Sequence, residues 1–127
     1  MTLFHLADAV TVTSANPVKV VNVTGVLGAT PLNRMPTQVC QVEVNGTGTC
    51  TAAFQWVGSL DSADVLPPSG TGGAWNNIGT VQTITCSTPG VTPAVATITS
   101  TTGYHRYGVI ISSISGSGAQ ASAVMDA

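Results

Sequence analysis

The amino-acid sequence predicts an all-β fold, an antiparallel β-sandwich of jelly-roll or immunoglobulin-like topology with seven or eight strands. Three observations support this prediction. Apolar and polar residues alternate with period two over much of the chain from Pro17 to Met125. Turn-forming residues recur at intervals of about ten residues, and no stretch has the pattern of a long helix. The length of 127 residues suits one domain with one core.

We expect the segment Gly103–Met125 to form a hairpin at the centre of this sandwich. It contains a long apolar strand, the turn sequence Ser115-Gly116-Ser117-Gly118 and a second strand rich in small residues. Glycine adopts positive φ angles without steric penalty, which suits a tight turn. Alternation gathers the large side chains of the first strand on one face, and we expect that face in the core: Tyr107, Val109 and Ile111.

A second antiparallel hairpin is predicted for Thr37–Val44 and Thr49–Leu60. The turn signal Asn45-Gly46-Thr47-Gly48 separates these two stretches. Alternation in the second stretch predicts an inward face with small and aromatic residues. Its two largest members, Phe54 and Trp56, complete our set of core candidates.

The remaining strands are expected at four places: Pro17–Thr24, Trp75–Gly79, Val81–Cys86 and Val91–Ser100. Two intervening segments are rich in Gly and Pro and predict loops, 25–36 and 61–74. We therefore assign residues 17–127 to the sandwich domain.

Residues 1–16 allow two interpretations. One is an extended N-terminal arm that lies on a neighbouring subunit, and the other is a first strand of the domain or a short helix. The segment has few strand-breaking residues but weak periodicity. If it is an arm, its apolar residues are the candidates for contact with a partner: Leu3, Phe4, Leu6 and Val10.

Charged residues are scarce, because only 6% of the chain is Asp, Glu, Lys or Arg. About a quarter is usual in a soluble domain. Such a surface offers little electrostatic repulsion between copies, so we expect the chain to associate readily. Three basic residues cannot neutralise a phosphate backbone, so nucleic acid is not an expected partner.

The sequence has no apolar run long enough for a transmembrane helix, so we expect no membrane partner. The N-terminus also lacks the basic region of a usual signal peptide, which predicts a protein made and kept in a cytoplasm. That compartment favours buried thiols for Cys40, Cys50 and Cys86. A Cys40–Cys50 disulfide is the alternative, because these two residues flank a turn.

No group of residues predicts a catalytic, cofactor or metal site, and we expect the chain not to be an enzyme. Asp61 and Asp64 share a loop, but calcium usually needs more oxygen ligands. Ser59, Asp61 and His105 supply the residue types of a nucleophilic triad without a nucleophile elbow. His5 and His105 are isolated in the sequence, which argues against zinc.

Four aromatic residues remain as candidates for a sugar-binding platform: Trp56, Trp75, Tyr104 and Tyr107. The alternative is that Trp56 and Tyr107 belong to the core while Trp75 closes the end of the sandwich. Arg106, between the two tyrosines, is expected to stack on a ring or to pair with Glu43 or Asp61.

Three sequence stretches, FQWVGSLDS (54–62), WNNIGT (75–80) and GYHRYGVIISSISGSGAQASAVM (103–125), together resemble small β-sandwich virion proteins of tailed bacteriophages. The family pattern is a "SLDG…W" loop followed by a closing "YRY…ISSISGTGA" hairpin. The matching positions are Ser59-Leu60-Asp61, Trp75, Tyr104, Arg106, Tyr107 and Ile111–Ala119. The chain departs from the pattern at Ser62, where glycine is common, and in its longer loop before Trp75.

The resemblance implies a non-enzymatic structural protein, such as a head decoration or cement protein or a head-fibre or tail-associated module. Its expected partners are the major capsid protein, other virion proteins and copies of itself. Its expected location is the virion, assembled in the host cytoplasm. The alternative function is a carbohydrate-binding module that attaches to a cell-surface glycan. Exposed coplanar aromatic rings would favour the carbohydrate-binding function, and buried rings would favour the structural one.

Overall fold

A computed structural model describes residues 3–22, 37–59, 75–87, 94–101, 104 and 106–126. These residues form strands and connecting segments, and no helix occurs among them. The strands in chain order are β1 (Leu3–Val10), β2 (Val21–Asn22), β3 (Gln38–Asn45), β4 (Cys50–Ser59), β5 (Asn76–Cys86), β6 (Ala94–Ser100), β7 (Arg106–Gly116) and β8 (Gln120–Asp126).

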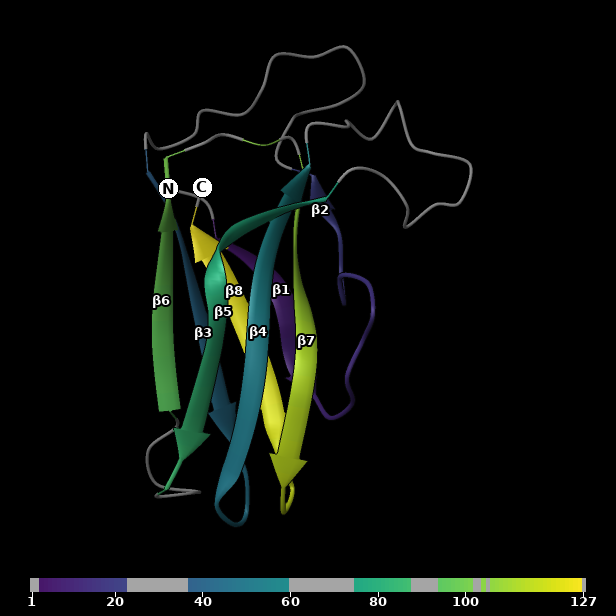
Figure 1. Cartoon of the computed structure of the whole chain (residues 1–127), viewed down its shortest axis with the longest axis vertical. Coiled ribbons are helices and arrows are strands. Elements are labelled where there is room, and N and C mark those ends of the chain that lie inside the picture. The colour runs from purple at the N-terminus through teal and green to yellow at the C-terminus, as the bar shows by residue number, and fades with distance from the viewer. Residues whose placement is uncertain are drawn as a thin grey trace.

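The strands form two four-stranded antiparallel sheets packed face to face (Figure 1). One sheet has the order β1-β8-β3-β6 and the other the order β2-β7-β4-β5. Strands therefore pair first with last, second with seventh, third with sixth and fourth with fifth. A long antiparallel ribbon that wraps over itself has this pairing, which is the jelly-roll arrangement. The predicted all-β sandwich is confirmed, and its topology is the jelly roll.

Both predicted hairpins are wrong in one respect, because their strands do not pair with each other. β3 belongs to one sheet and β4 to the other, and the same is true of β7 and β8. Each predicted turn instead carries the chain across the sandwich. The two turns are joined by backbone hydrogen bonds, since the N–H groups of Thr47 and Gly48 donate to the Ser117 carbonyl at 2.9 and 3.3 Å.

Two other strand predictions need correction. Of the strand expected at Pro17–Thr24, the described residues 17–22 contain only the two residues of β2, and residues 23 and 24 lie outside the described part of the chain. The strands expected at Trp75–Gly79 and Val81–Cys86 are one strand, β5. Its ladder with β4 shifts register around Gly79, whose φ of 69° is tolerated by glycine.

The described part of residues 1–16 begins with strand β1, which pairs with β8 along the edge of its sheet. Leu6 is fully buried, and Phe4 and Val10 are partly buried against the core. Leu3 is 60% exposed. The side chains proposed for an arm are thus divided between the interior of this domain and its surface.

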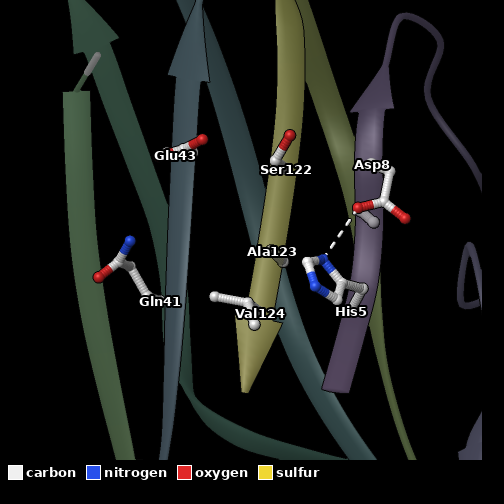
Figure 2. Close-up of a pocket in the computed structure, with 8 residues that line it drawn as sticks. His5, Asp8, Gln41, Glu43, Ser122, Ala123 and Val124 are labelled. Carbon is white, nitrogen blue, oxygen red and sulfur yellow. Dashed lines mark hydrogen bonds and ion pairs between the residues drawn. The ribbon is translucent and has the colours of Figure 1, made fainter. Parts of the chain in front are cut away.

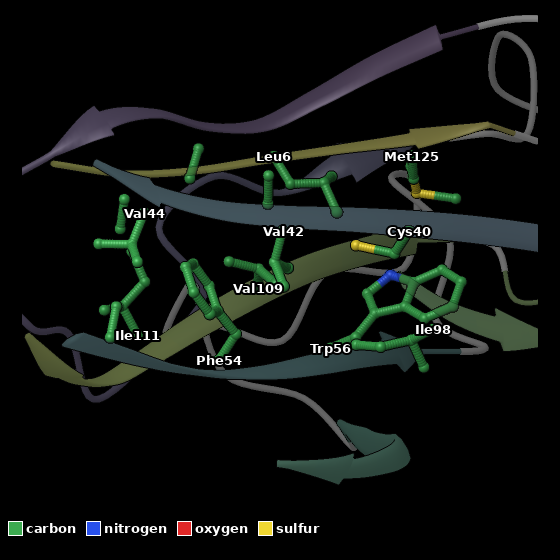
Figure 3. Packing of buried hydrophobic residues seen from close by; sticks show 14 of the residues in the cluster. Leu6, Cys40, Val42, Val44, Phe54, Trp56, Ile98, Val109, Ile111 and Met125 are labelled. Atoms are coloured by element: carbon green, nitrogen blue, oxygen red, sulfur yellow. The ribbon is translucent and has the colours of Figure 1, made fainter. Parts of the chain in front are cut away.

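The core lies between the two sheets, and side chains from both sheets meet there (Figure 3). Leu6, Val42 and Met125 point inward from the first sheet, and Phe54, Trp56, Val109 and Ile111 point inward from the second. All five core candidates named from the sequence are 0% exposed: Phe54, Trp56, Tyr107, Val109 and Ile111.

Candidate functional site

The aromatic residues gather at one end of the sandwich. Trp56 and Tyr107 stack with ring centroids 5.6 Å apart, and Tyr104 meets Tyr107 edge to face at 5.9 Å. The backbone N–H of Tyr104 also donates a hydrogen bond to the Tyr107 hydroxyl at 3.0 Å. The indole N–H of Trp56 meets no acceptor among the residues that the structure describes, so this side chain stabilises the fold through its buried ring.

Gly58 makes room for this cluster, because a Cβ atom there would lie 2.5 Å from the Tyr104 ring. Arg106 is 1% exposed, and its guanidinium lies 5.1 Å from the centroid of the Trp75 ring. The stacking expected for Arg106 is therefore present, with Trp75 as the ring. Trp56 and Tyr107 are fully buried, and Trp75 and Tyr104 are half-buried. These rings close the sandwich end and form no exposed coplanar platform among the described residues.

The cysteines are free thiols, and all three are buried. The buried-thiol prediction is confirmed. Cys50 lies directly opposite Cys86 in the β4–β5 ladder, whereas Cys40 belongs to β3 in the other sheet. Burial raises the pKa of Cys40 to about 12. Burial also raises the pKa of Cys50, with a further contribution from the Cys86 thiol. The thiols of Cys40 and Cys50 therefore remain protonated at neutral pH, so they are poor nucleophiles.

A shallow hollow of about 180 Å³ lies on the outer face of the first sheet, over β1, β8 and β3 (Figure 2). His5 and Asp8 stand on one side, with His5 Nδ1 and Asp8 Oδ1 3.1 Å apart. Gln41 and Glu43 stand on the other side, and Ser122 and Val124 lie between. β1 shifts register beside this hollow, where Ala9 has a φ of 48° and donates its N–H to Ser122 Oγ at 2.9 Å.

The hollow can form hydrogen bonds with a polar partner, but its own contact between His5 and Asp8 is weak. The side chains of His5 and Asp8 are 63% and 70% exposed, so water screens their attraction. Sequence reasoning missed this group because Glu43 joins it only through sheet pairing. His5 pairs with Val124, and Val124 pairs with Gln41 on the next strand.

Only one of the catalytic candidates lies in the described part of the chain. Asp61, Asp64 and His105 lie outside the described residues, and Ser59 is fully buried. Among the described residues, no three His, Cys, Asp or Glu side chains are placed to hold a metal ion. The described chain also contains no apolar helix long enough to cross a membrane.

The exposed faces of the strands are mainly uncharged. Val95 on β6 is 50% exposed and Val81 on β5 is 49% exposed. Between them, β5 and β6 contain no Asp, Glu, Lys or Arg. The side of the sandwich formed by these two strands therefore presents mainly Thr, Val and Asn side chains to its surroundings.

Comparison of the chain with protein-family models, curated proteins and solved structures found no match.

Proposed function

We propose that this chain is a structural protein of a tailed-bacteriophage virion, a capsid decoration or cement protein that binds the particle surface in many copies and stabilises it. One observation carries the proposal: the folded domain presents an outer surface with very few charges. Only eight of 127 residues are formally charged. Contacts made by such a surface rely on apolar burial and neutral hydrogen bonds, which salt screens little.

The sequence motifs support the same proposal. The stretches that resemble phage virion proteins supply the centre of one sheet and the aromatic end of the domain, in β4, β5 and β7. The proposed partners are the major capsid protein and copies of this chain, and the proposed location is the virion assembled in the host cytoplasm. The burial of Trp56 and Tyr107 favours this function over glycan binding, which needs accessible rings.

The test begins with particles from a phage whose genome encodes this chain and from a strain with that gene deleted. We expect the purified protein to co-sediment with the deletion particles at saturating, fixed stoichiometry. We also expect bound protein to raise the temperature at which the particles release their DNA. Binding should persist in high salt, because the contacts are uncharged.

Two outcomes would contradict the proposal. If mass spectrometry finds no copy of the protein in wild-type particles, the chain is not a virion protein. Binding that disappears at high salt would show that charged groups hold the protein to the particle. A glycan array provides the control for the carbohydrate-binding alternative, since the structural function predicts no retained sugar.

A further inference from the structure

The four outer edges of the two sheets differ in how they are protected. An unpaired edge strand offers N–H and C=O groups to any other strand, and proteins usually block it with bulges, charges, proline or covering segments. The edge of β1 is protected by two register shifts and by the charged residue Asp8. The edge of β5 is protected by the register shift around Gly79.

The edge of the second sheet beside β7 is covered by the segment 11–20. Ser14 and Val18 donate their N–H groups to the carbonyls of Ile111 and Val109, both at 3.0 Å. Pro17 lies over Gly108, where an added Cβ would come within 2.5 Å of it. This edge is therefore closed by the chain itself.

Within the described ranges of the chain, β6 has none of these protections. It pairs with β3 without a register shift over seven residues, and it contains no proline and no charged residue. No other described strand pairs with its far edge. Figure 1 shows β6 at one side of the sandwich, next to β5. Alternate residues of a regular edge strand direct their N–H and C=O groups outward, so β6 presents a straight row of hydrogen-bonding groups.

The side chains of β6 complement a second β6 in antiparallel orientation. A two-fold axis at Thr97 would place Thr97 opposite its own copy and Val95 opposite Thr99 of the other chain. All three side chains are exposed and lie on the same face of the strand. Pairs of β-branched residues stabilise antiparallel strands, and no charge opposes this self-pairing.

We propose that β6 is a docking edge for a second copy of this chain, which joins two β1-β8-β3-β6 sheets into one eight-stranded sheet. The role of this pairing in particle assembly rests on the proposed function. The pairing itself can be measured with the isolated protein. Seven paired residues extend for about 23 Å. A stable interface needs about 1,000 Å² in total, and the half-exposed Val95 lies on the strand at its centre.

The test introduces charged side chains at the two-fold axis. Thr97→Lys places two ammonium groups opposite each other in the dimer, and like charges across an interface oppose association. Thr97→Glu does the same with two carboxylates. A mixture of the two variants places opposite charges at the axis. Thr11→Lys is the matched control, because Thr11 is exposed and follows β1, the other edge strand of this sheet.

Sedimentation equilibrium of the full chain is measured from about 10 μM to 1 mM, where weak dimers form. We expect the wild-type chain and Thr11→Lys to dimerise equally. Each Thr97 variant alone should dimerise at least about tenfold more weakly. The Thr97→Lys and Thr97→Glu mixture should recover a dimer that weakens as salt is raised, whereas the wild-type dimer should not.

Three outcomes would overturn the proposal: a wild-type chain that stays monomeric over the whole range, Thr97 variants that dimerise like wild type, or a mixture that does not recover. Particle co-sedimentation separates this failure from a failure of the proposed function. If the wild-type monomer still binds particles and Thr97→Lys abolishes that binding, then β6 docks on a strand of another virion protein. Circular dichroism of each variant verifies that the domain is folded.

Discussion

The two long sides of the sandwich are built differently. On one side, the segment 11–20 runs beside β7, and its N–H groups at Ser14 and Val18 satisfy carbonyls of that strand. On the other side, β5 and β6 lie next to each other without such a cover from the described residues. The covered side also includes β1, whose Leu6 is part of the core.

From this difference we expect one side of the sandwich to determine folding stability and the other to determine association with partners. The covered side includes residues that fill space inside the domain, such as Leu6, and their replacement should be costly for folding. The outward-facing residues of β5 and β6 are exposed and uncharged, so their replacement should affect association more than folding. The following experiments test this division, beginning with the largest expected effect.

Leu6→Ala should destabilise the domain by about 2–5 kcal/mol, because it leaves a cavity among fully buried side chains. Leu3→Ala is the matched control on the same strand, where the side chain is 60% exposed, and should change stability by no more than about 0.5 kcal/mol. Denaturant unfolding measures both. Equal effects for the two variants would show that β1 is a peripheral arm and not part of the core.

Gly108→Ala should cost about 1–3 kcal/mol, because the added methyl group overpacks against Pro17. The same substitution in a Pro17→Gly background should cost less, since the opposing ring is gone. A double-mutant cycle from denaturant unfolding gives the coupling between the two positions. Independent effects would indicate that the segment 11–20 does not press on β7.

Stability should fall above about pH 9 through Cys40, which lies opposite Ile98 of β6. Its pKa rises from 9.0 to about 12 in the folded state. The unfolded thiol therefore ionises while the folded thiol stays protonated, and this favours unfolding between these values. The loss is at most about 1.4 kcal/mol per pH unit for one thiol.

Unfolding midpoints of wild type and Cys40→Ala between about pH 9 and 11 isolate this contribution, because the variant lacks the thiol. A steeper decline in wild type is expected. Identical slopes, or fast reaction of Cys40 with a thiol reagent in the native protein, would mean that solvent reaches the core behind β6.

Val95→Thr should have the smallest effect on folding, within about 0.5 kcal/mol, because the side chain is exposed and keeps its shape. The same change should weaken association, since it replaces an apolar methyl group with a hydroxyl. Denaturant unfolding and sedimentation equilibrium measure the two properties separately. A large loss of folding stability would place Val95 among core residues and remove the contrast between the sides.

The strand content of this chain follows from local sequence patterns. Period-two alternation identified most of β3, β4 and β7, because burial of one strand face imposes that period. The same patterns identified Phe54, Trp56, Tyr107, Val109 and Ile111, all of which are fully buried. The turn near Ser115–Gly118 was also located from its glycines, since Gly116 and Gly118 have φ angles of 107° and 64°.

The hollow near His5 and Glu43 was beyond prediction from sequence. Its residues belong to three strands that are distant in the chain and adjacent in the sheet. The separation of Cys40 from Cys50 had the same cause. These cysteines flank one turn, yet that turn connects two different sheets, and Cys50 meets Cys86 on the neighbouring strand.

The sequence by itself determined that the chain forms a β-sandwich and where most of its strands and two of its turns lie. Only the tertiary structure decided that β3 pairs with β6 and β8, that β4 pairs with β5 and β7, and that the sandwich is a jelly roll. The physical reason is the range of the interactions. Alternation and turn chemistry act within a few residues, and a glycine-rich turn suits a hairpin as well as a crossing between sheets. Pairing partners are selected by burial between strands that are far apart in sequence. The pattern of one strand shows which of its faces is buried, but it does not show which strand lies beside it.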